Sequence, residues 1–202
     1  MIVRELNTVV TFLEMTNEAI HNVAPPSNLK LMLLRAENIS LVFYRFLYSA
    51  VGHNFNWYDR RYFTDDELAA AIHVDGVEIW VLYVGGQPAG YFELVPRHGN
   101  VMELEYFGVI PEFHGRGLGR WLLNEAIRAA WARQPGKLIV ETCSLDGPRA
   151  LPLYQKMGFT PYAQEAKVMI VVAVGITAAL IVKTIASAIV RYAEIHLSLI
   201  HI

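Results

Sequence analysis

Residues 103–123, ELEYFGVIPEFHGRGLGRWLL, decide the fold that we predict for this sequence. The stretch begins as a strand in which two sets of side chains alternate, with Glu103, Glu105 and Phe107 on one face and Leu104, Tyr106 and Gly108 on the other. Pro111 then ends the strand, because proline cannot donate a hydrogen bond to a sheet. The alternation predicts that the Glu103 and Glu105 carboxylates share one face.

A glycine-rich loop and a helix follow this strand. Gly115, Gly117 and Gly119 leave the loop backbone uncovered by side chains. The next segment is an amphipathic helix, since its apolar residues recur at helical spacing: Leu118, Trp121, Leu122 and Ala126. The first N–H groups of a helix lack partners and lie at the positive end of its dipole. We therefore predict that the loop binds a phosphate or pyrophosphate.

Two common phosphate-binding motifs do not fit the loop. A P-loop requires Lys-Ser/Thr after its last glycine, and a dinucleotide fingerprint requires Gly-x-Gly-x-x-Gly, whose last interval is one residue longer than here. The hexapeptide at 114–119, HGRGLG, instead resembles the acyl-CoA loop of the GNAT superfamily of N-acetyltransferases, whose pattern is Arg/Gln-x-x-Gly-x-Gly/Ala. His114 departs from this pattern at the first position.

A second stretch, ALPLYQKMGF at 150–159, also resembles this family. It matches the pattern Ala-x-x-x-Tyr-x-x-x-Gly-Phe, and one helix and one strand separate it from the glycine loop, as they do in the family. The resemblance covers about residues 64–163. The segments LDGPRALPLY, FYRFLY and ELVPR are similar in sequence to one bacterial subgroup of uncharacterised members of this family. We therefore expect the N-terminal part to belong to the same domain.

The order of predicted elements gives an α+β fold, a GNAT-like sandwich of a mixed, mostly antiparallel sheet with flanking helices. A helical crossover joins the strands at 101–109 and 137–143, which makes them parallel, and Gly108 is where we expect them to splay apart. The predicted elements are a strand at 8–15, a helical stretch at 29–51, a capped helix from Thr64, a hairpin at 76–84 and 88–96, a strand at 101–109, a helix at 117–133, a strand at 137–143, a short helix before Gly158 and a strand from Phe159.

The resemblance implies an acyl-CoA co-substrate, most simply acetyl-CoA, held largely by backbone. The main chain near Phe107 and Val109 would pair with the pantetheine amides, the loop N–H groups would hold the pyrophosphate, and Arg116 or Arg120 would add positive charge. The residues expected to contact the cofactor are Phe107, Gly108, Val109, His114, Gly115, Arg116, Gly117, Leu118, Gly119 and Arg120.

The same resemblance implies direct transfer of the acyl group to an amine. An attacking amine must lose a proton, so a base is needed within hydrogen-bond reach. Glu103 and Glu105 are both candidates, and a water chain or an amine that is already neutral is the alternative. Tyr154 is the candidate acid for the leaving thiolate, unless it only packs the short helix. A backbone N–H near Val109 would bind the oxyanion.

The acceptor pocket is harder to read. The segment HNFNWYDRRYF at 53–63 is either a loop capped by aromatics or a wall of this pocket, since aromatic side chains with polar tips suit a partly wet cleft. Its Trp57 and Tyr58, with Ser144 and Asp146 at a strand end, are the candidate substrate contacts. The acceptor class stays open among polyamines, aminoglycosides, amino acids and protein N-termini. Two rival hypotheses remain open. One is a protein of this fold that binds acyl-CoA without catalysis, as a sensor or partner, and the other is a membrane-associated protein whose hydrophobic tail is the functional part.

Composition narrows the function classes. A net charge of −2 and a pI of about 6.4 give no electrostatic reason to expect a nucleic-acid partner. The single cysteine, Cys143, fits a reducing compartment and is either a buried small residue or, less simply, a nucleophile. The His and Cys residues show no metal-ligand spacing, so we expect no metal. The N-terminus does not resemble a secretory signal, so we expect a cytoplasmic protein. We expect it to be a monomer or a homodimer.

The C-terminal part differs in composition from the rest. We divide the chain into an acyltransferase domain, 1–166, and a hydrophobic tail, 167–202, in which residues 168–182 carry no charge. Three interpretations remain open: a membrane anchor, a last strand followed by an amphipathic helix, or a non-native read-through, because LSLIHI at 197–202 matches one frame of a common sequencing adapter. Association with a membrane is expected only through this tail.

Overall fold

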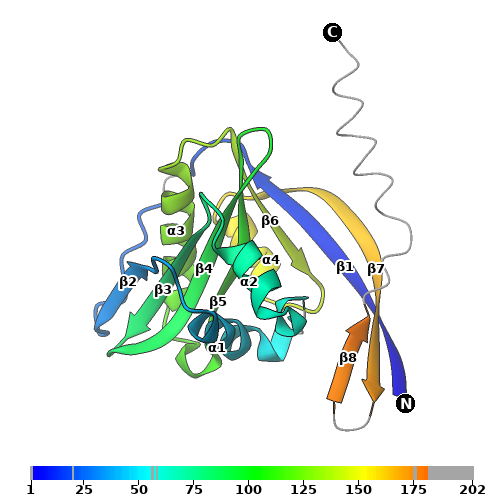
Figure 1. Ribbon diagram of the computed structural model, residues 1–202. Helices are drawn as coiled ribbons and strands as arrows, with labels where there is room; N and C mark the ends of the chain where they lie inside the picture. Colours follow the sequence, from blue (N-terminus) through cyan, green and yellow to red (C-terminus); the bar gives the residue numbers. More distant parts are fainter. Residues whose placement is uncertain (1, 20, 56, 58, 175–176, 182–202) are drawn as a thin grey trace.

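A computed structural model describes residues 2–19, 21–55, 57, 59–174 and 177–181 of the chain. They form one mixed eight-stranded sheet, in the order β2-β3-β4-β5-β6-β1-β7-β8, with helices on both faces (Figure 1). The α+β class is confirmed.

The strands are β1 (Ile2–Met15), β2 (Leu31–Arg35), β3 (Glu78–Val84), β4 (Gln87–Arg97), β5 (Val101–Val109), β6 (Lys137–Cys143), β7 (Thr160–Val174) and β8 (Thr177–Ile181). The helices are α1 (Leu41–Gly52), α2 (Asp65–Ile72), α3 (Leu118–Trp131) and α4 (Ala150–Lys156), with 3₁₀ turns at His53–Phe55, Asp59–Tyr62 and Pro111–Phe113.

Strands β3, β4 and β5 form the predicted antiparallel meander. Gly85 and Gly86 connect the first two with φ angles of 58° and 85°, the left-handed pair that a two-residue type I′ hairpin requires. Helix α2 begins with the predicted capping box, in which the Thr64 hydroxyl accepts from the Glu67 N–H and the Glu67 carboxylate accepts from the Thr64 N–H. These local signals were sufficient because each involves residues close in sequence.

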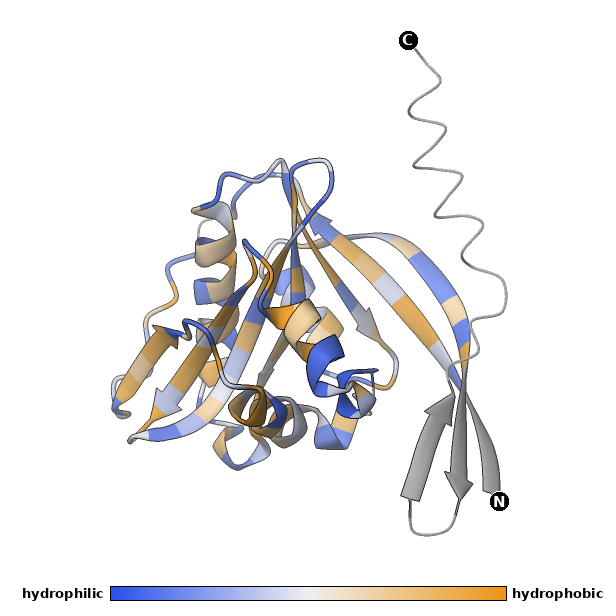
Figure 2. Cartoon of the chain, in the orientation of Figure 1, coloured by the Kyte–Doolittle hydropathy of each residue, from blue (hydrophilic) through white to orange (hydrophobic). Residues whose placement is uncertain are grey.

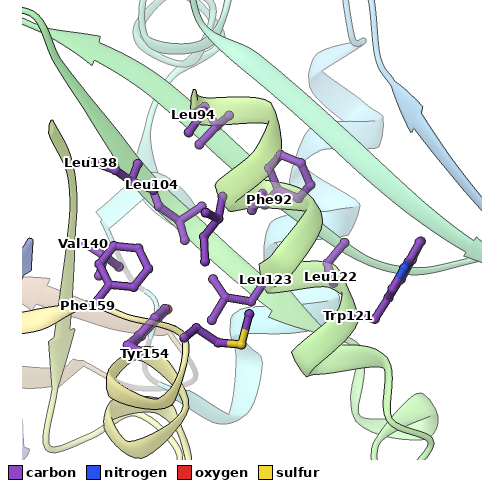
Figure 3. Packing of buried hydrophobic residues seen from close by; sticks show 14 of the residues in the cluster. Phe92, Leu94, Leu104, Trp121, Leu122, Leu123, Leu138, Val140, Tyr154 and Phe159 are labelled. Carbon is purple, nitrogen blue, oxygen red and sulfur yellow. The ribbon is translucent and has the colours of Figure 1, made fainter. Parts of the chain in front are cut away.

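Helices α1 and α2 cover one face of the sheet and helices α3 and α4 cover the other. On the second face, Leu122 and Leu123 of α3 point toward Phe92 and Leu104 of the central strands (Figure 3). The predicted stripe of α3 is buried, at Leu118, Trp121, Leu122 and Ala126. The central strands are therefore apolar on both faces, and polar groups inside them need a specific reason.

The helical stretch predicted at 29–51 is wrong in its first half. Residues 31–35 form the edge strand β2, which pairs antiparallel with β3 from Leu31 opposite Val84 to Arg35 opposite Trp80. Helix α1 begins only at Leu41, where the Ser40 hydroxyl caps it by accepting from the Phe43 N–H at 3.3 Å. A leucine-rich run has no periodicity that separates strand from helix, and here pairing with a distant strand decides it.

Strands β5 and β6 are parallel, as predicted, but they part earlier than predicted. Their pairing runs only from Val101 opposite Lys137 to Leu104 opposite Val140. Beyond Leu104 the two strands diverge, whereas we expected the break at Gly108. The divergence coincides with a bulge in β5, and it leaves residues 105–109 without a strand partner on their β6 side.

Strand β1 lies between β6 and β7, so the N-terminal segment is inserted between strands from the C-terminal part of the chain. Figure 2 shows hydrophobic and hydrophilic residues alternating along β1 and β7 where they are coloured. Strand β7 is continuous across the predicted domain boundary at 166/167 and includes the strand that one interpretation of the tail placed after 167. The helix that this interpretation placed directly after the strand is not found at 177–181, where β8 pairs antiparallel with β7. Residues 182–202 lie outside the described residues. Within the described part of the chain, no helix is long and apolar enough to cross a membrane.

Candidate active site

A cavity of about 900 Å³ opens where β5 and β6 diverge. The glycine loop and the start of α3 form one end, and the 53–63 segment forms the other. Most of the predicted site residues line it: Trp57, Glu103, Glu105, Phe107, Gly108, Val109, His114, Gly115, Gly117, Leu118, Gly119, Arg120, Asp146 and Tyr154. Arg116 and Ser144 do not line it, and Tyr58 lies outside the described residues. Sequence motifs far apart in the chain thus meet in one cavity.

The loop end is built from backbone. Gly117 caps α3 with a φ of 78°, a left-handed conformation that favours glycine. Side chains added at Gly115 or Gly119 would meet nothing within 4 Å, so the space above these glycines is open. The first turn of α3 faces that space with its unpaired N–H groups. This arrangement fits the pyrophosphate of an acyl-CoA.

His114 has a structural role that explains its departure from the family pattern. Its Nε2 donates to the Val109 carbonyl oxygen at 2.7 Å, which ties the loop to the end of β5. The loop conformation is therefore fixed by a side chain at this position, while anion binding depends on the N–H groups that follow. Arg116 points elsewhere, because its guanidinium donates to the Glu112 carbonyl oxygen and stacks over the Phe113 ring.

A bulge in β5 interrupts the alternation that we predicted for this strand, which was therefore wrong beyond Glu105. Glu93 pairs with Tyr106 and Leu94 with Leu104, so Glu105 is an extra residue without a partner on β4. Beyond it the faces are exchanged: Phe107 packs with the core under α3, and Tyr106 packs with the core under α1. Phe107 therefore does not share a face with Glu103, as we had predicted. The period-2 pattern in the sequence contains no sign of an inserted residue.

The two predicted carboxylates do converge, and Arg97 joins them. The Arg97 Nε donates to Glu103 at 2.5 Å, and its Nη2 donates to Glu105. Burial raises the pKa of both carboxyls above the usual range, and Arg97 opposes this without cancelling it. A carboxylate whose pKa is raised above its usual range is a stronger base than an ordinary one and suits proton removal from an amine. Arg97 was not predicted from the sequence.

Tyr154 lies on α4 against the same cavity. Its ring packs edge-on against that of Phe159, with the centroids 5.8 Å apart (Figure 3). On β5, the Phe107 ring packs edge-on against it with the centroids 6.1 Å apart. Burial, with a smaller contribution from the charge of Asp146, raises the pKa of its hydroxyl well above normal. The hydroxyl is therefore protonated at neutral pH and has a proton to donate.

A buried ion pair fixes the other end of the cavity. The Arg60 Nη1 donates to both Glu93 carboxylate oxygens at 2.7 Å, and the Tyr44 hydroxyl donates to Glu93 at 2.8 Å. The Arg60 guanidinium also lies 4.6 Å from the centre of the Tyr106 ring and 3.9 Å from Glu105. The pair anchors the 53–63 segment to β4 and β5. Sequence reasoning missed it, although an acidic residue inside an apolar strand was a usable signal.

Trp57 is held in the cavity wall by close packing. Its ring lies 5.1 Å from that of Tyr106 and 5.5 Å from that of Tyr48, and it covers Gly52, where a Cβ would come within 2.5 Å of it. Gly108 is required for the same reason, since a Cβ there would lie 2.3 Å from Val51 of α1. Gly52 thus lets the Trp57 ring pack against α1, and Gly108 lets α1 approach β5.

The remaining predicted contacts are mainly structural. The Ser144 hydroxyl binds the Thr8 hydroxyl and accepts from the Val9 N–H, both at 3.1 Å, so it joins β6 to β1. Asp146 borders the cavity but accepts from the Thr142 hydroxyl at 2.7 Å and the Cys143 N–H at 2.9 Å, which closes a turn. Burial raises the pKa of the Cys143 thiol, which disfavours the thiolate that a nucleophile needs.

Comparison with known proteins gives the class of the chain. The acetyltransferase (GNAT) family matches residues 42–159, more than half of the chain. The chain belongs to this family, whose members transfer acetyl groups from acetyl-CoA. No curated protein sequence matches the chain.

Solved structures share the fold at low sequence identity. A conserved protein of unknown function from Staphylococcus epidermidis aligns at 17% identity and a TM-score of 0.55, over 82% of this chain and 62% of that one. A GCN5-related N-acetyltransferase from Sphaerobacter thermophilus aligns at 14% identity with a TM-score of 0.54, and the alignment covers 92% of this chain and 55% of that one. A Bacillus subtilis acetyltransferase in complex with CoA aligns at 21% identity with a TM-score of 0.51, and the alignment covers 66% of this chain and 79% of that one. The chain thus spans about three fifths of the Staphylococcus protein.

Proposed function

We propose that this protein transfers the acetyl group of acetyl-CoA to a primary amine by direct attack within a ternary complex. The observation that carries the proposal is the meeting of three parts in one cavity: the open glycine loop, the Arg97-bound carboxylate pair and the Tyr154 hydroxyl. Each part supplies one requirement of acyl transfer, namely cofactor binding, proton removal and leaving-group protonation.

The diverging strands support the placement of the cofactor. Residues 105–109 have no strand partner on the β6 side. Apart from the Val109 carbonyl, which accepts from His114, their backbone groups on that side can pair with the pantetheine amides as an added strand does. The loop N–H groups then bind the pyrophosphate, with Arg120 at the cavity edge. The thioester would lie between Val109 and Tyr154, where a backbone N–H can stabilise the oxyanion.

The chemistry balances with the groups present. Glu103 or Glu105 takes a proton from the ammonium form of the acceptor, and the neutral amine attacks the thioester carbonyl carbon. The attacking nitrogen releases its second proton to solvent and the carbon–sulfur bond breaks as the amide forms. The CoA thiolate receives the Tyr154 hydroxyl proton, and the protonated carboxyl returns its proton to solvent. The tyrosinate regains a proton from solvent, because a phenol with a raised pKa is reprotonated readily.

Mass-spectrometric detection of the acetylated amine tests the proposal. With acetyl-CoA and a panel of primary amines, the wild-type chain is expected to form the amide and free CoA in equal amounts. Tyr154→Phe should lower kcat by about 10²-fold with the KM for acetyl-CoA nearly unchanged, because only the proton donor is lost. Tight binding of CoA without any product, and no effect of Tyr154→Phe, would favour a sensor over an enzyme.

A further inference from the structure

We propose that the acceptor is a compact diamine, whose reacting amino group lies at the Glu103–Glu105 pair and whose second, charged amino group is bound by Asp59 beside the aromatic wall. This inference rests on the proposed function, since it names the acceptor class for the same cavity. It depends on the charges and rings at the end of the cavity away from the glycine loop.

Carboxylates are the main charged groups at this end. Asp59 comes from the 3₁₀ turn, Glu103 and Glu105 from β5 and Glu141 from β6, and all of them line the cavity. They therefore approach the acceptor space from separate elements. A space bordered by carboxylates on different sides favours a ligand with more than one positive charge.

The nearby cations are already engaged. Arg60 is paired with the buried Glu93 at 2.7 Å, and Arg97 is shared by Glu103 and Glu105. Lys167, the remaining cation that lines this end, lies 3.6 Å from Glu165. The negative charge at the acceptor end thus exceeds the positive charge that the protein supplies there.

Asp59 is the carboxylate best placed for a second ammonium group. No hydrogen bond joins its side chain to another described residue, in contrast to Glu103 and Glu105. Partial removal from water raises the pKa of its carboxyl, and the charges of Arg60 and Lys167 oppose this incompletely. A ligand ammonium would add a hydrogen-bonded counter-charge to the more distant charges of Arg60 and Lys167.

Aromatic rings complete this subsite. Tyr48, Trp57 and Tyr106 line the cavity with Asp59, and their ring centres lie 5.1 to 5.5 Å from one another. Ring faces attract an alkylammonium group, and the same surfaces pack against a short methylene chain. An acceptor carboxylate at this place would instead meet like charge, which disfavours amino acids.

Three acceptors of equal chain length isolate the charge at the far end. 1,4-Diaminobutane, butylamine and 4-aminobutanoate offer the same primary amine with a positive, neutral or negative second end. We expect kcat/KM to fall in that order, with the diamine about 10-fold above butylamine, which corresponds to about 1.4 kcal/mol. Asp59→Asn should reduce the diamine-to-butylamine ratio to near one, whereas the matched control Asp65→Asn, on exposed α2, should keep it.

Calorimetric binding of the same amines in the presence of CoA separates this inference from the proposed function. Tighter binding of the diamine than of butylamine, lost in Asp59→Asn, supports the diamine subsite whether or not product forms. Absence of product with every amine would then count against catalysis alone. Equal affinities for diamine and butylamine, or an unchanged ratio in Asp59→Asn, would overturn the inference.

Discussion

The glycine loop and the 53–63 segment border the same cavity, yet the first offers backbone groups and the second offers side chains. In the loop, Gly115 and Gly119 leave space and the N–H groups of α3 face it. At the other end, Trp57 and Tyr106 form a wall that the buried Arg60–Glu93 pair holds in place. Under the proposed function, the loop end would bind the CoA pyrophosphate through backbone groups, while the other end would select the acceptor through individual side chains.

This difference predicts how the two ends respond to mutation. Changes at the loop should alter cofactor affinity and little else, because the loop is local and exposed. Changes at the acceptor end should affect the chemistry or the stability of the fold, because it holds the half-buried Glu103 and Glu105 and rests on the buried Arg60–Glu93 pair.

Removing both carboxylates should give the largest effect. Glu103→Gln together with Glu105→Gln is expected to lower kcat by about 10³-fold, since general base catalysis contributes about 10²- to 10⁴-fold. The KM for acetyl-CoA should change little. The single variants, measured in the same assay, identify which residue is the base. A double variant with nearly wild-type kcat would mean that neither carboxylate removes the proton.

Breaking the buried ion pair should destabilise the fold. Arg60→Met leaves the Glu93 carboxylate buried without its partner, which is expected to cost about 3–5 kcal/mol. Chemical denaturation measures this cost. Arg128→Met is the control, because Arg128 forms a surface pair with Glu125 and its loss should cost less than about 1 kcal/mol. An equal, small loss in both variants would show that the Arg60–Glu93 pair does not anchor the segment.

A change in the glycine loop should affect cofactor binding moderately. Gly117→Ala forces a side chain into a φ of 78°, a strain of about 1–2 kcal/mol that is expected to raise the KM for acetyl-CoA by about 5- to 10-fold. Gly99→Ala is a matched control, since Gly99 has a φ of 76° in the β4–β5 turn with nothing within 4 Å of an added Cβ. Equal KM values in both variants would contradict cofactor binding by the loop.

The smallest expected effect is a shift in pH dependence. Activity requires an ionised carboxylate, so it should fall as the pH drops through the raised pKa values of Glu103 and Glu105. Arg97 lowers these pKa values, and Arg97→Gln should therefore move the acidic limb of the kcat/KM profile to higher pH. Arg128→Gln serves as the control. An acidic limb that stays in place would separate Arg97 from the base.

The comparison also explains which parts the sequence could predict. The glycine loop, the Thr64 capping box and the Gly85–Gly86 hairpin are local patterns, and each is found where it was expected. The Arg60–Glu93 pair joins residues 33 positions apart, and the local sequence around either residue does not indicate its partner.

Two further misses have the same physical origin. Residues 31–35 are a strand because β3 pairs with them, and the bulge at Glu105 exists because β4 and β5 pair with unequal numbers of residues. Both are properties of pairing between strands, which periodicity in one segment does not contain. The assignment of Phe107 to the carboxylate face failed for this reason.

The central claim is that both ends of the cavity act on one bound pair of substrates. Initial rates of CoA release, measured at varied acetyl-CoA and varied 1,4-diaminobutane, test it most directly. Direct attack in a ternary complex predicts intersecting double-reciprocal lines and no burst of CoA before the amine is added. Parallel lines with such a burst would contradict the account, because they would show an acetylated protein intermediate, for which Cys143 is the nearby nucleophile.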